Sequence, residues 1–599
     1  MNTPFRPLIL CVAFASLLIG CGKSPENAPA KVRSTTGHPL SSPAVSACEP
    51  GQPGGRLTLV AVGVPRTFNP VLVEESASDA IVRLLFAGLA SVDMTTQEPR
   101  PGLAESWNVS PDGRSWTFKL RAGLRWNDGE PLTADDVVFT WNEVMYNREL
   151  NRATYDLFQI DGKKVEVSKL DDVTIRVVTP AVFAPFLEFF GNVPILPRHT
   201  IGREVAEGRF LNVFTPTSRP DKIVGSGPFR VKEFQPGKSV LLERNPEYWV
   251  ADKTGRRLPY LDEVLVEFGG RGASQQMFLG GHGDVCESTR PEDFAAFQAA
   301  LPSGKFQIVE LGAGSERDFM WFNLNTNVNR AGQPLVAPAK EKWFHEKNFR
   351  QAVSCAIDRD RLVREIYAGR AVASLTFLSN ENPKWNNPNV AQYGFDPARA
   401  RQLLAAIGIQ DRNGDGTFED ADGRVIEFSL MSNGGNPLRE RAAQAIAADL
   451  NRFGFKVSPQ TVPYEALTGP GGIINGTFDY ESILMGLGGG GLDPTAQSLV
   501  LKSSEPLHQW FPNQRTPATD WEARIDALID AQTRTLDFAT RKKAYDEVQA
   551  ILAEQLPMVY TVTPLHFAAA RPNLANLRPS VISVYRLTWN VEELYFKKP

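Results

Sequence analysis

Residue types that could perform catalysis are present, but they are scattered along the 599-residue chain. The six histidines include no pair at the spacing of helical metal ligands, and no HExxH motif occurs. No GxSxG motif marks a serine nucleophile, and the cysteines have no evident partner histidine. These patterns argue against a metal hydrolase, a serine hydrolase and a thiol enzyme.

A glycine-rich run at Gly486–Gly491 formally contains the GxGxxG pattern of dinucleotide-binding loops, and it follows a predicted strand. Five glycines in six residues satisfy many patterns, and the next helix starts only after Pro494. A dinucleotide site is therefore a weak interpretation of this run.

The run Asp411–Gly416 places oxygen ligands at alternate positions and a glycine at the sixth, like the first half of a calcium-binding loop. An EF-hand has a glutamate at the twelfth position, where this chain has an aspartate, and a strand is predicted to follow at Val425. An acidic surface turn is the alternative, and no cofactor is otherwise required. The candidate ligands of a structural calcium are Asp411, Asn413, Asp415 and Asp422.

The composition is that of a soluble globular protein, with 42% hydrophobic and 22% charged residues. The formal charge of −4 provides no basic excess for a phosphate backbone, so nucleic acid is not expected as a partner. A chain of this length exceeds what one hydrophobic core usually supports. We therefore expect at least two lobes.

The N-terminus resembles a bacterial lipoprotein signal. The apolar run Leu8–Ile19 is shorter than the roughly 20 residues that span a bilayer, and it leads into Leu18–Cys21, which resembles a lipobox. We expect residues 1–20 to be a signal peptide and Cys21 to carry the lipid anchor in the periplasm or cell envelope. The alternative is an ordinary signal peptide with a chance cysteine.

Residues 21–55 are rich in Pro, Ser, Ala and Gly, and we expect them to form a flexible tether, with the folded part starting near Arg56. Outside the leader and anchor, three cysteines remain, so a fully paired disulfide framework is excluded. Cys48 lies in the expected tether. Cys286 and Cys355 could pair, or Cys355 could be a buried thiol.

Local periodicity predicts a mixed α/β first half and a helix-rich second half. The predicted strands cover residues 56–62, 116–120, 174–178, 229–234, 264–268, 425–431 and 478–484. The predicted helices cover residues 80–89, 349–367, 397–407, 437–453, 521–535 and 537–555, with a further helix capped by Thr133.

The block Pro101–Val144 resembles the signature of the family 5 solute-binding proteins, which serve peptide and nickel ABC importers. Further blocks agree in order, at residues 225–229, 245–249, 322–326, 349–359 and 556–558. The resemblance implies an α/β, two-lobed periplasmic-binding-protein-like fold of type II, in its large cluster C form, with a hinge and an inter-lobe ligand cleft. It places lobe 1 at residues 56–317, with an inserted subdomain around 100–220, lobe 2 at 318–564, and a return segment at 565–599 that completes lobe 1.

The resemblance also implies site residues. Peptide-binding relatives use the strand end before the glycine run for main-chain contacts and place an aspartate for the ligand ammonium where this chain has Gly490. Glu74 could supply that charge instead, whereas Glu75 could equally be a solvated turn residue. The predicted ligand-binding residues are Glu74, Ser76, Tyr155, Gly486, Leu487, Gly488 and Gly490.

The expected function is that of a monomeric, lipid-anchored binding protein that captures a peptide-like solute and delivers it to the transmembrane subunits of an ABC permease. Because an acid is missing at Gly490, the alternative ligand is an oligosaccharide or another polar uncharged solute. A sensor that uses the same fold is a further alternative.

Overall fold

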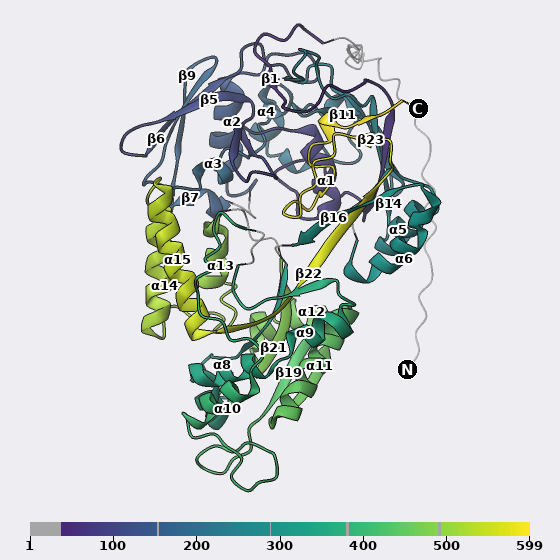
Figure 1. Ribbon diagram of the computed structural model, residues 1–599. Coiled ribbons are helices and arrows are strands. Elements are labelled where there is room, and N and C mark those ends of the chain that lie inside the picture. The colour runs from purple at the N-terminus through teal and green to yellow at the C-terminus, as the bar shows by residue number, and fades with distance from the viewer. Residues whose placement is uncertain are drawn as a thin grey trace, which may run out of the picture.

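The computed structural model describes residues 37–151, 155–287, 289–314, 316–378, 382–488 and 493–598 of the chain. Two lobes follow one another along the long axis of the molecule, and the strand β22 (Met558–Ala570) runs from one to the other (Figure 1). Within these residues, no helix is long and apolar enough to cross a membrane. The predicted anchor Cys21 and the candidate Gly490 lie outside them.

Lobe 1 contains two four-stranded sheets. In the first sheet the order is β11-β12-β14-β2, and β2 is its edge strand, parallel to β14. The second sheet, β5-β6-β10-β9, is antiparallel and has its own hydrophobic core around Trp116, Phe118 and Trp141, in the region where an inserted subdomain was expected. The strands are β2 (Arg56–Val62), β5 (Ala104–Val109), β6 (Ser115–Leu120), β9 (Glu166–Asp171), β10 (Thr174–Val178), β11 (Phe229–Gln235), β12 (Ser239–Arg244) and β14 (Glu263–Gly269).

Lobe 2 is a layered α/β unit. Its strands belong to a sheet with the order β15-β22-β17-β21-β19-β20, and the long helix α11 packs against β19 and β20. The lobe 2 strands are β17 (Arg317–Phe322), β19 (Glu427–Asn433), β20 (Lys456–Val462) and β21 (Ser482–Leu487). The short strand β15 (Val285–Cys286) joins the same sheet from the lobe 1 side, at the C-terminal end of β22. The main helices are α7 (Pro338–His345), α8 (Lys347–Ala356), α10 (Pro397–Ala405), α11 (Pro437–Phe453), α14 (Asp520–Thr533) and α15 (Phe538–Gln555).

The chain passes between the lobes along paired strands. The C-terminal half of β22 pairs with β16 (Gln307–Ala313) on the lobe 1 side, whereas its N-terminal half pairs with β17 in lobe 2. The short strand β18 (Ala371–Ala373) pairs with the middle of β22, at Val562–Pro564. Asp318 and Pro564, the expected crossings, both lie in this region.

Local capping signals explain where several helices start. The Thr133 hydroxyl accepts a hydrogen bond from Asp135 N, and a capping box forms at the start of α2 (Ala134–Phe139). One predicted helix, at residues 349–367, is wrong as a continuous element. It breaks after α8 because the Asp358 carboxylate accepts a hydrogen bond from Arg361 N and starts a new short helix.

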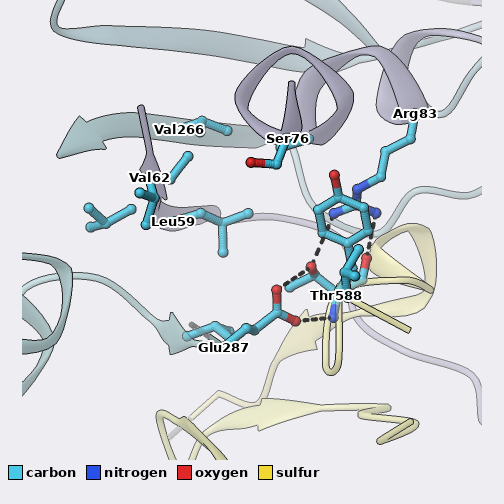
Figure 2. Close-up of a pocket in the computed structure, with 13 residues that line it drawn as sticks. Leu59, Val62, Ser76, Arg83, Val266, Glu287 and Thr588 are labelled. Atoms are coloured by element: carbon cyan, nitrogen blue, oxygen red, sulfur yellow. Dashed lines mark hydrogen bonds between the residues drawn. The ribbon is translucent and has the colours of Figure 1, made fainter. Parts of the chain in front are cut away.

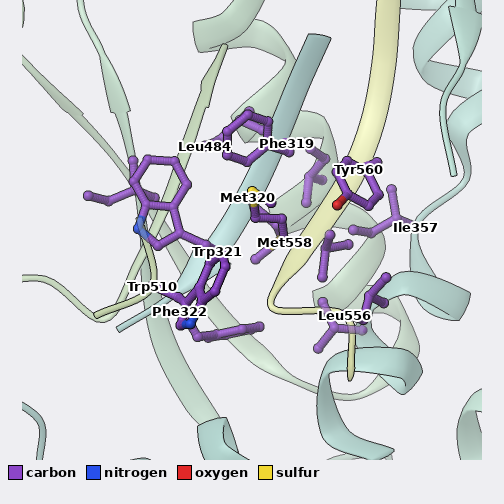
Figure 3. Packing of buried hydrophobic residues seen from close by; sticks show 14 of the residues in the cluster. Phe319, Met320, Trp321, Phe322, Ile357, Leu484, Trp510, Leu556, Met558 and Tyr560 are labelled. Atoms are coloured by element: carbon purple, nitrogen blue, oxygen red, sulfur yellow. The ribbon is translucent and has the colours of Figure 1, made fainter. Parts of the chain in front are cut away.

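The core of lobe 2 is dominated by aromatic side chains at the centre of its sheet (Figure 3). Trp321 and Phe322 of β17 are fully buried, and Trp510 packs into the same cluster. The Trp510 indole donates to the Glu522 carboxylate at 2.9 Å, which satisfies its polar atom inside the core. These tryptophans therefore stabilise the lobe and present no stacking face to a ligand.

The structure differs from the expected tether at residues 44–48, which contact lobe 1. The strand β1 (Ala44–Val45) pairs in parallel with β13 (Val250–Ala251), and Cys48 is buried against Tyr260. A two-residue strand has no periodicity to recognise, so composition alone favoured a tether. Cys48, Cys286 and Cys355 are free buried thiols, so the possible Cys286–Cys355 bond is absent from the structure.

Candidate ligand pocket

A pocket of about 180 Å³ opens on lobe 1 between the edge strand β2, the helix α1 (Ser76–Leu85) and a segment near the C-terminus (Figure 2). Its apolar walls come mainly from β2 and from Val266 and Val285. The polar residues that line it are Ser76, Arg83, Glu287, Tyr585 and Thr588. Apolar walls with a few convergent polar groups are typical of ligand sites.

Glu287 fixes the C-terminal wall of the pocket. Its carboxylate accepts hydrogen bonds from Leu587 N at 2.5 Å, from Thr588 N at 2.7 Å and from the Thr588 hydroxyl at 3.0 Å (Figure 2). Burial raises the pKa of this carboxyl, and the nearby charge of Arg83 and these hydrogen bonds oppose the rise. The pocket wall therefore depends on an acid almost 300 residues away in sequence.

Arg83 holds the same wall from the other side. Its guanidinium donates to the Thr588 carbonyl oxygen at 3.0 Å and to the Thr588 hydroxyl at 3.1 Å. It also lies 3.6 Å from the centre of the Tyr585 ring, in cation–π contact. The Tyr585 hydroxyl donates to Asp79 at 2.5 Å, and burial raises its pKa well above the usual range.

The predicted lobe 1 residues differ in their placement. Ser76 lines the pocket, as the first residue of α1, and Glu74 is exposed just before it. Glu75 has a structural role instead, because its carboxylate accepts hydrogen bonds from Arg66 N at 3.0 Å and from the Ser78 hydroxyl at 2.5 Å. Tyr155 lies in the inserted region and is absent from the pocket lining.

The predicted lobe 2 residues lie at the end of β21, where Gly486 pairs with Asp318 and Leu487 with Arg317 of β17. A Cβ atom on Gly486 would be 2.1 Å from the Arg439 Nη2 atom and 2.6 Å from the Asp318 Oδ1 atom. Arg439 fills the space beside this glycine in the direction of a Cβ atom, and a main-chain contact of Gly486 with a ligand stays a prediction. Gly488 is exposed, and a Cβ atom on it would be 3.3 Å from the Glu316 Cβ atom.

A buried ionic cluster of Asp318, Arg439 and Tyr367 lies next to the end of β21, at the crossing between the lobes. Arg439 donates to Asp318 Oδ1 through Nε at 2.9 Å and through Nη2 at 2.7 Å. The Tyr367 hydroxyl donates to Asp318 Oδ2 at 2.6 Å. Burial would lower the pKa of Arg439, but the Asp318 charge outweighs it and raises that pKa.

The candidate calcium loop is shaped by its own hydrogen bonds. The Asp411 carboxylate accepts from Gly414 N at 2.7 Å and from Gly416 N at 3.0 Å, and Asp422 forms an ion pair with Arg424 at 2.6 Å. No group of three or more His, Cys, Asp or Glu side chains in the described ranges is arranged to hold a metal ion. The structure therefore does not gather Asp411, Asn413, Asp415 and Asp422 around one point, and calcium binding stays a prediction.

The lobes also contact each other away from the pocket. Ala184 N in the inserted region donates to the Thr533 carbonyl oxygen at the end of α14, at 2.8 Å. Lys384 of lobe 2 forms an ion pair with Glu98 of lobe 1 at 2.8 Å. These contacts hold the two lobes together at the margin of the molecule.

Comparison with known proteins gives consistent matches along the chain. The model of the family described as bacterial extracellular solute-binding proteins, family 5, matches residues 98–507. A probable ABC transporter-binding protein of Deinococcus radiodurans is 28% identical over 573 residues, which are 90% of this chain and 94% of that protein. A periplasmic alpha-galactoside-binding protein of Rhizobium meliloti is 27% identical over 391 residues, covering 62% of this chain and 55% of that protein.

A solved structure agrees with these matches. The oligopeptide-binding protein AppA of Bacillus subtilis, in complex with a nonapeptide, superposes with a TM-score of 0.64 at 26% identity. The match covers 91% of this chain and all of AppA. The two-lobed α/β fold expected from the sequence is therefore confirmed. Since the family model covers well over half of its residues, the chain belongs to the family 5 bacterial extracellular solute-binding proteins.

Proposed function

We propose that this protein captures a peptide-like solute at the lobe 1 pocket, closes lobe 2 over it and delivers it to the permease of an ABC importer. Family 5 proteins are extracytoplasmic solute-binding proteins of such importers, and this member is a binding protein rather than an enzyme. The observation that carries the choice of ligand is the sheet edge at the pocket.

The edge strand β2 offers main-chain groups to an extended ligand. The backbone amide and carbonyl groups of Thr58 point away from β14 and bind Asp284 instead. The Thr58 carbonyl oxygen accepts from Asp284 N at 2.8 Å, and the Thr58 amide donates to the Asp284 carboxylate at 2.7 Å. Alternate residues of a parallel strand face the same side. Val60 and Val62 therefore also direct their backbone groups away from β14, along the wall of the pocket. A peptide strand could add to this edge.

A second candidate ligand is an oligosaccharide. The position where peptide-binding relatives place an aspartate for the ligand ammonium is Gly490 here, and a buried ammonium without an acid partner is strongly disfavoured. The alpha-galactoside-binding relative also supports this alternative. Glu74 remains the proposed acid for a peptide ammonium, since it is exposed beside Ser76.

Native mass spectrometry of protein purified from its source would test the pocket and the ligand class together. We expect a retained peptide in the wild type and in Ser168→Trp, an exposed change on β9 of the same lobe. Ser76→Trp should abolish retention, because the indole would enter the pocket. Retention in Ser76→Trp would contradict the proposed site, and a retained mass that fragments as a sugar would favour the second candidate.

We also propose that the mature protein is a monomer anchored through lipid on Cys21, after removal of residues 1–20. The support is the lipobox-like Leu18–Cys21 directly after a short apolar run.

A further inference from the structure

Lobe 1 contains two further cavities, each of about 420 Å³, whose role the solute pocket does not explain. We call the one beneath residues 43–47 the outer cavity and the one beneath α1 the inner cavity. They share a wall made of Ser91, Arg100, Tyr248, Trp249 and Glu592. The stacked pair of Arg83 and Tyr585 lines both the inner cavity and the solute pocket, and thus separates these two spaces.

Glu592 is a buried acid without an ion-pair partner in the ranges that the structure describes, and its carboxylate accepts a hydrogen bond from its own backbone amide. Its residue is 9% exposed, and among the described residues its carboxylate has no ion pair or side-chain hydrogen bond. The neighbouring Glu593 differs, because it accepts hydrogen bonds from the Ser46 hydroxyl at 2.5 Å and from Asn590 Nδ2 at 2.7 Å. Burial raises the pKa of the Glu592 carboxyl, and the charge of Arg100 opposes the rise.

Arg100 is a cation facing the same wall. Its Nε atom donates to the Ser91 hydroxyl at 2.9 Å, and its guanidinium lies 5.6 Å from the centre of the Trp589 ring. Within the described part of the chain, no carboxylate lies within ion-pair distance of it. Arg100 and Glu592 therefore both line the two cavities, and no ion pair joins them. An unpaired buried charge is costly, so Glu592, which shares its wall with the half-buried Arg100, calls for a partner.

We infer that this wall binds a free α-amino acid, with the ligand carboxylate on Arg100 and its ammonium on Glu592. The planar guanidinium suits bidentate binding of a carboxylate. The apolar lining of the inner cavity, which includes Val82, Phe86 and Trp589, suits an apolar or aromatic side chain. A volume of about 420 Å³ lies within the usual range of ligand pockets, roughly 300 to 1,000 Å³.

The chemistry favours a zwitterion over a singly charged ligand. An anion would satisfy Arg100 and leave Glu592 unpaired, whereas an amine would do the reverse. A long peptide carries its two charges at opposite ends, much farther apart than the two charges of an amino acid. An amino acid bears both charges on one carbon and thus matches two neighbouring groups.

A ligand could enter from the outer cavity, which is covered by Pro43–Ala47. That segment is held by few bonds, among them Ala44 N to the Trp249 carbonyl oxygen at 3.1 Å and Ser46 N to the Ala251 carbonyl oxygen at 2.8 Å. Segments with few hydrogen bonds open at low cost. Brief release of β1 would expose Arg100 and Glu592.

Anomalous diffraction from crystals soaked with 4-bromo-L-phenylalanine would locate the site directly. We expect a bromine peak in the inner cavity, close to Trp589. A peak found only between the lobes, or no peak in lobe 1, would overturn the inference. The full chain from Cys21 onward should be used, because the segment 43–47 closes the outer cavity.

Calorimetry with the same probe separates the two charge contacts. Loss of one charged hydrogen bond corresponds to a drop in affinity of about 10- to 100-fold. We expect a drop of this size for Glu592→Gln and for Arg100→Gln, and for wild type with the N-acetyl or amide form of the probe. The exposed changes Glu49→Gln and Arg114→Gln serve as matched controls and should bind like wild type.

Two further measurements, the melting temperature without ligand and the retention of the solute, separate loss of this site from a general structural effect. Glu592→Gln removes an unpaired buried acid, so the melting temperature without ligand should stay equal or rise. Retention of the solute at the Ser76 pocket should not change in either variant, which distinguishes this site from the transport ligand. Equal affinity for the probe and its N-acetyl form on wild type would refute the inference even if a variant failed to fold.

Discussion

Acidification should weaken lobe 1 and its pocket wall, because the neutral ring of His566 is a hydrogen-bond acceptor in that wall. His566 lies on β22 and is 9% exposed. Its Nδ1 atom is 2.7 Å from Arg586 Nη2, so a neutral ring accepts from that guanidinium. Arg586 directly follows the pocket residue Tyr585. Protonation of His566 would place two cations against each other.

The magnitude follows from the pKa of His566, which burial and the charges of Arg586 and Arg370 lower from 6.5 to about 4. Between these values the unfolded chain binds a proton that the folded protein does not bind. The stability that the neutral His566 contributes is therefore fully present above pH 6.5, and it is lost as the pH falls toward 4. The difference between the pKa of His566 in the unfolded chain and in the folded protein corresponds to about 3 kcal/mol of unfolding free energy. About 2.5 kcal/mol of this is lost by pH 4.5.

Urea unfolding at pH 7.5 and pH 4.5 would test this reasoning. In His566→Gln, the amide oxygen can still accept from Arg586 but does not titrate, so the loss on acidification should be smaller than in wild type by about 2 to 3 kcal/mol. His282→Gln, an exposed change in the same lobe, is the control and should behave like wild type. Protection from hydrogen exchange at residues 584–588, corrected for the intrinsic pH dependence of exchange, should fall at pH 4.5 in wild type but not in His566→Gln. The same loss of free energy in wild type and His566→Gln would refute the argument.

Other changes test separate parts of the structure. Gly486→Ala should lower the free energy of unfolding by about 1 to 3 kcal/mol because its methyl group would meet Arg439, whereas Gly488→Ala should be tolerated in the same denaturation assay. Asp318→Asn should cost about 3 to 5 kcal/mol by leaving Arg439 buried beside a neutral partner, and an unchanged urea midpoint would contradict this. Glu287→Ala should speed hydrogen exchange at Leu587 and Thr588, while Glu287→Gln keeps one acceptor oxygen and should change it less. Cys21→Ser should leave a folded protein that no longer partitions into detergent, and unchanged partitioning would rule out the anchor.

Most secondary structure could be predicted because its signals are local. The strand at residues 174–178 and the helix at 437–453 have the predicted bounds, since Pro437 follows a capping asparagine and Gly454 ends the helix. The resemblance to a family supplied the order of the lobes, which no local pattern contains. The error at residues 349–367 arose where one capping aspartate interrupted a continuous apolar period.

The site could be predicted only in part, because its residues come from distant segments. Ser76 was predicted through the resemblance and lines the candidate pocket. Arg83, Glu287 and Thr588 are joined by contacts that span about 300 to 500 residues, which the sequence does not indicate. Nothing near Glu287 in the sequence indicates that its carboxylate receives two backbone amides. The sequence likewise does not indicate that Arg439 lies beside Gly486, because the two residues meet only in the fold.

The position of β22 connects these observations. One half of this strand lies in the sheet of lobe 2, and the other half carries His566, which binds the segment that forms the pocket wall. Glu287 follows β15, which pairs with the same end of β22. A movement of lobe 2 relative to lobe 1 would therefore shift both His566 and Glu287, which hold the segment that contains Tyr585 and Thr588. The wall of the proposed solute pocket is thus attached to the strand that links the lobes, and this attachment would couple ligand binding to lobe closure.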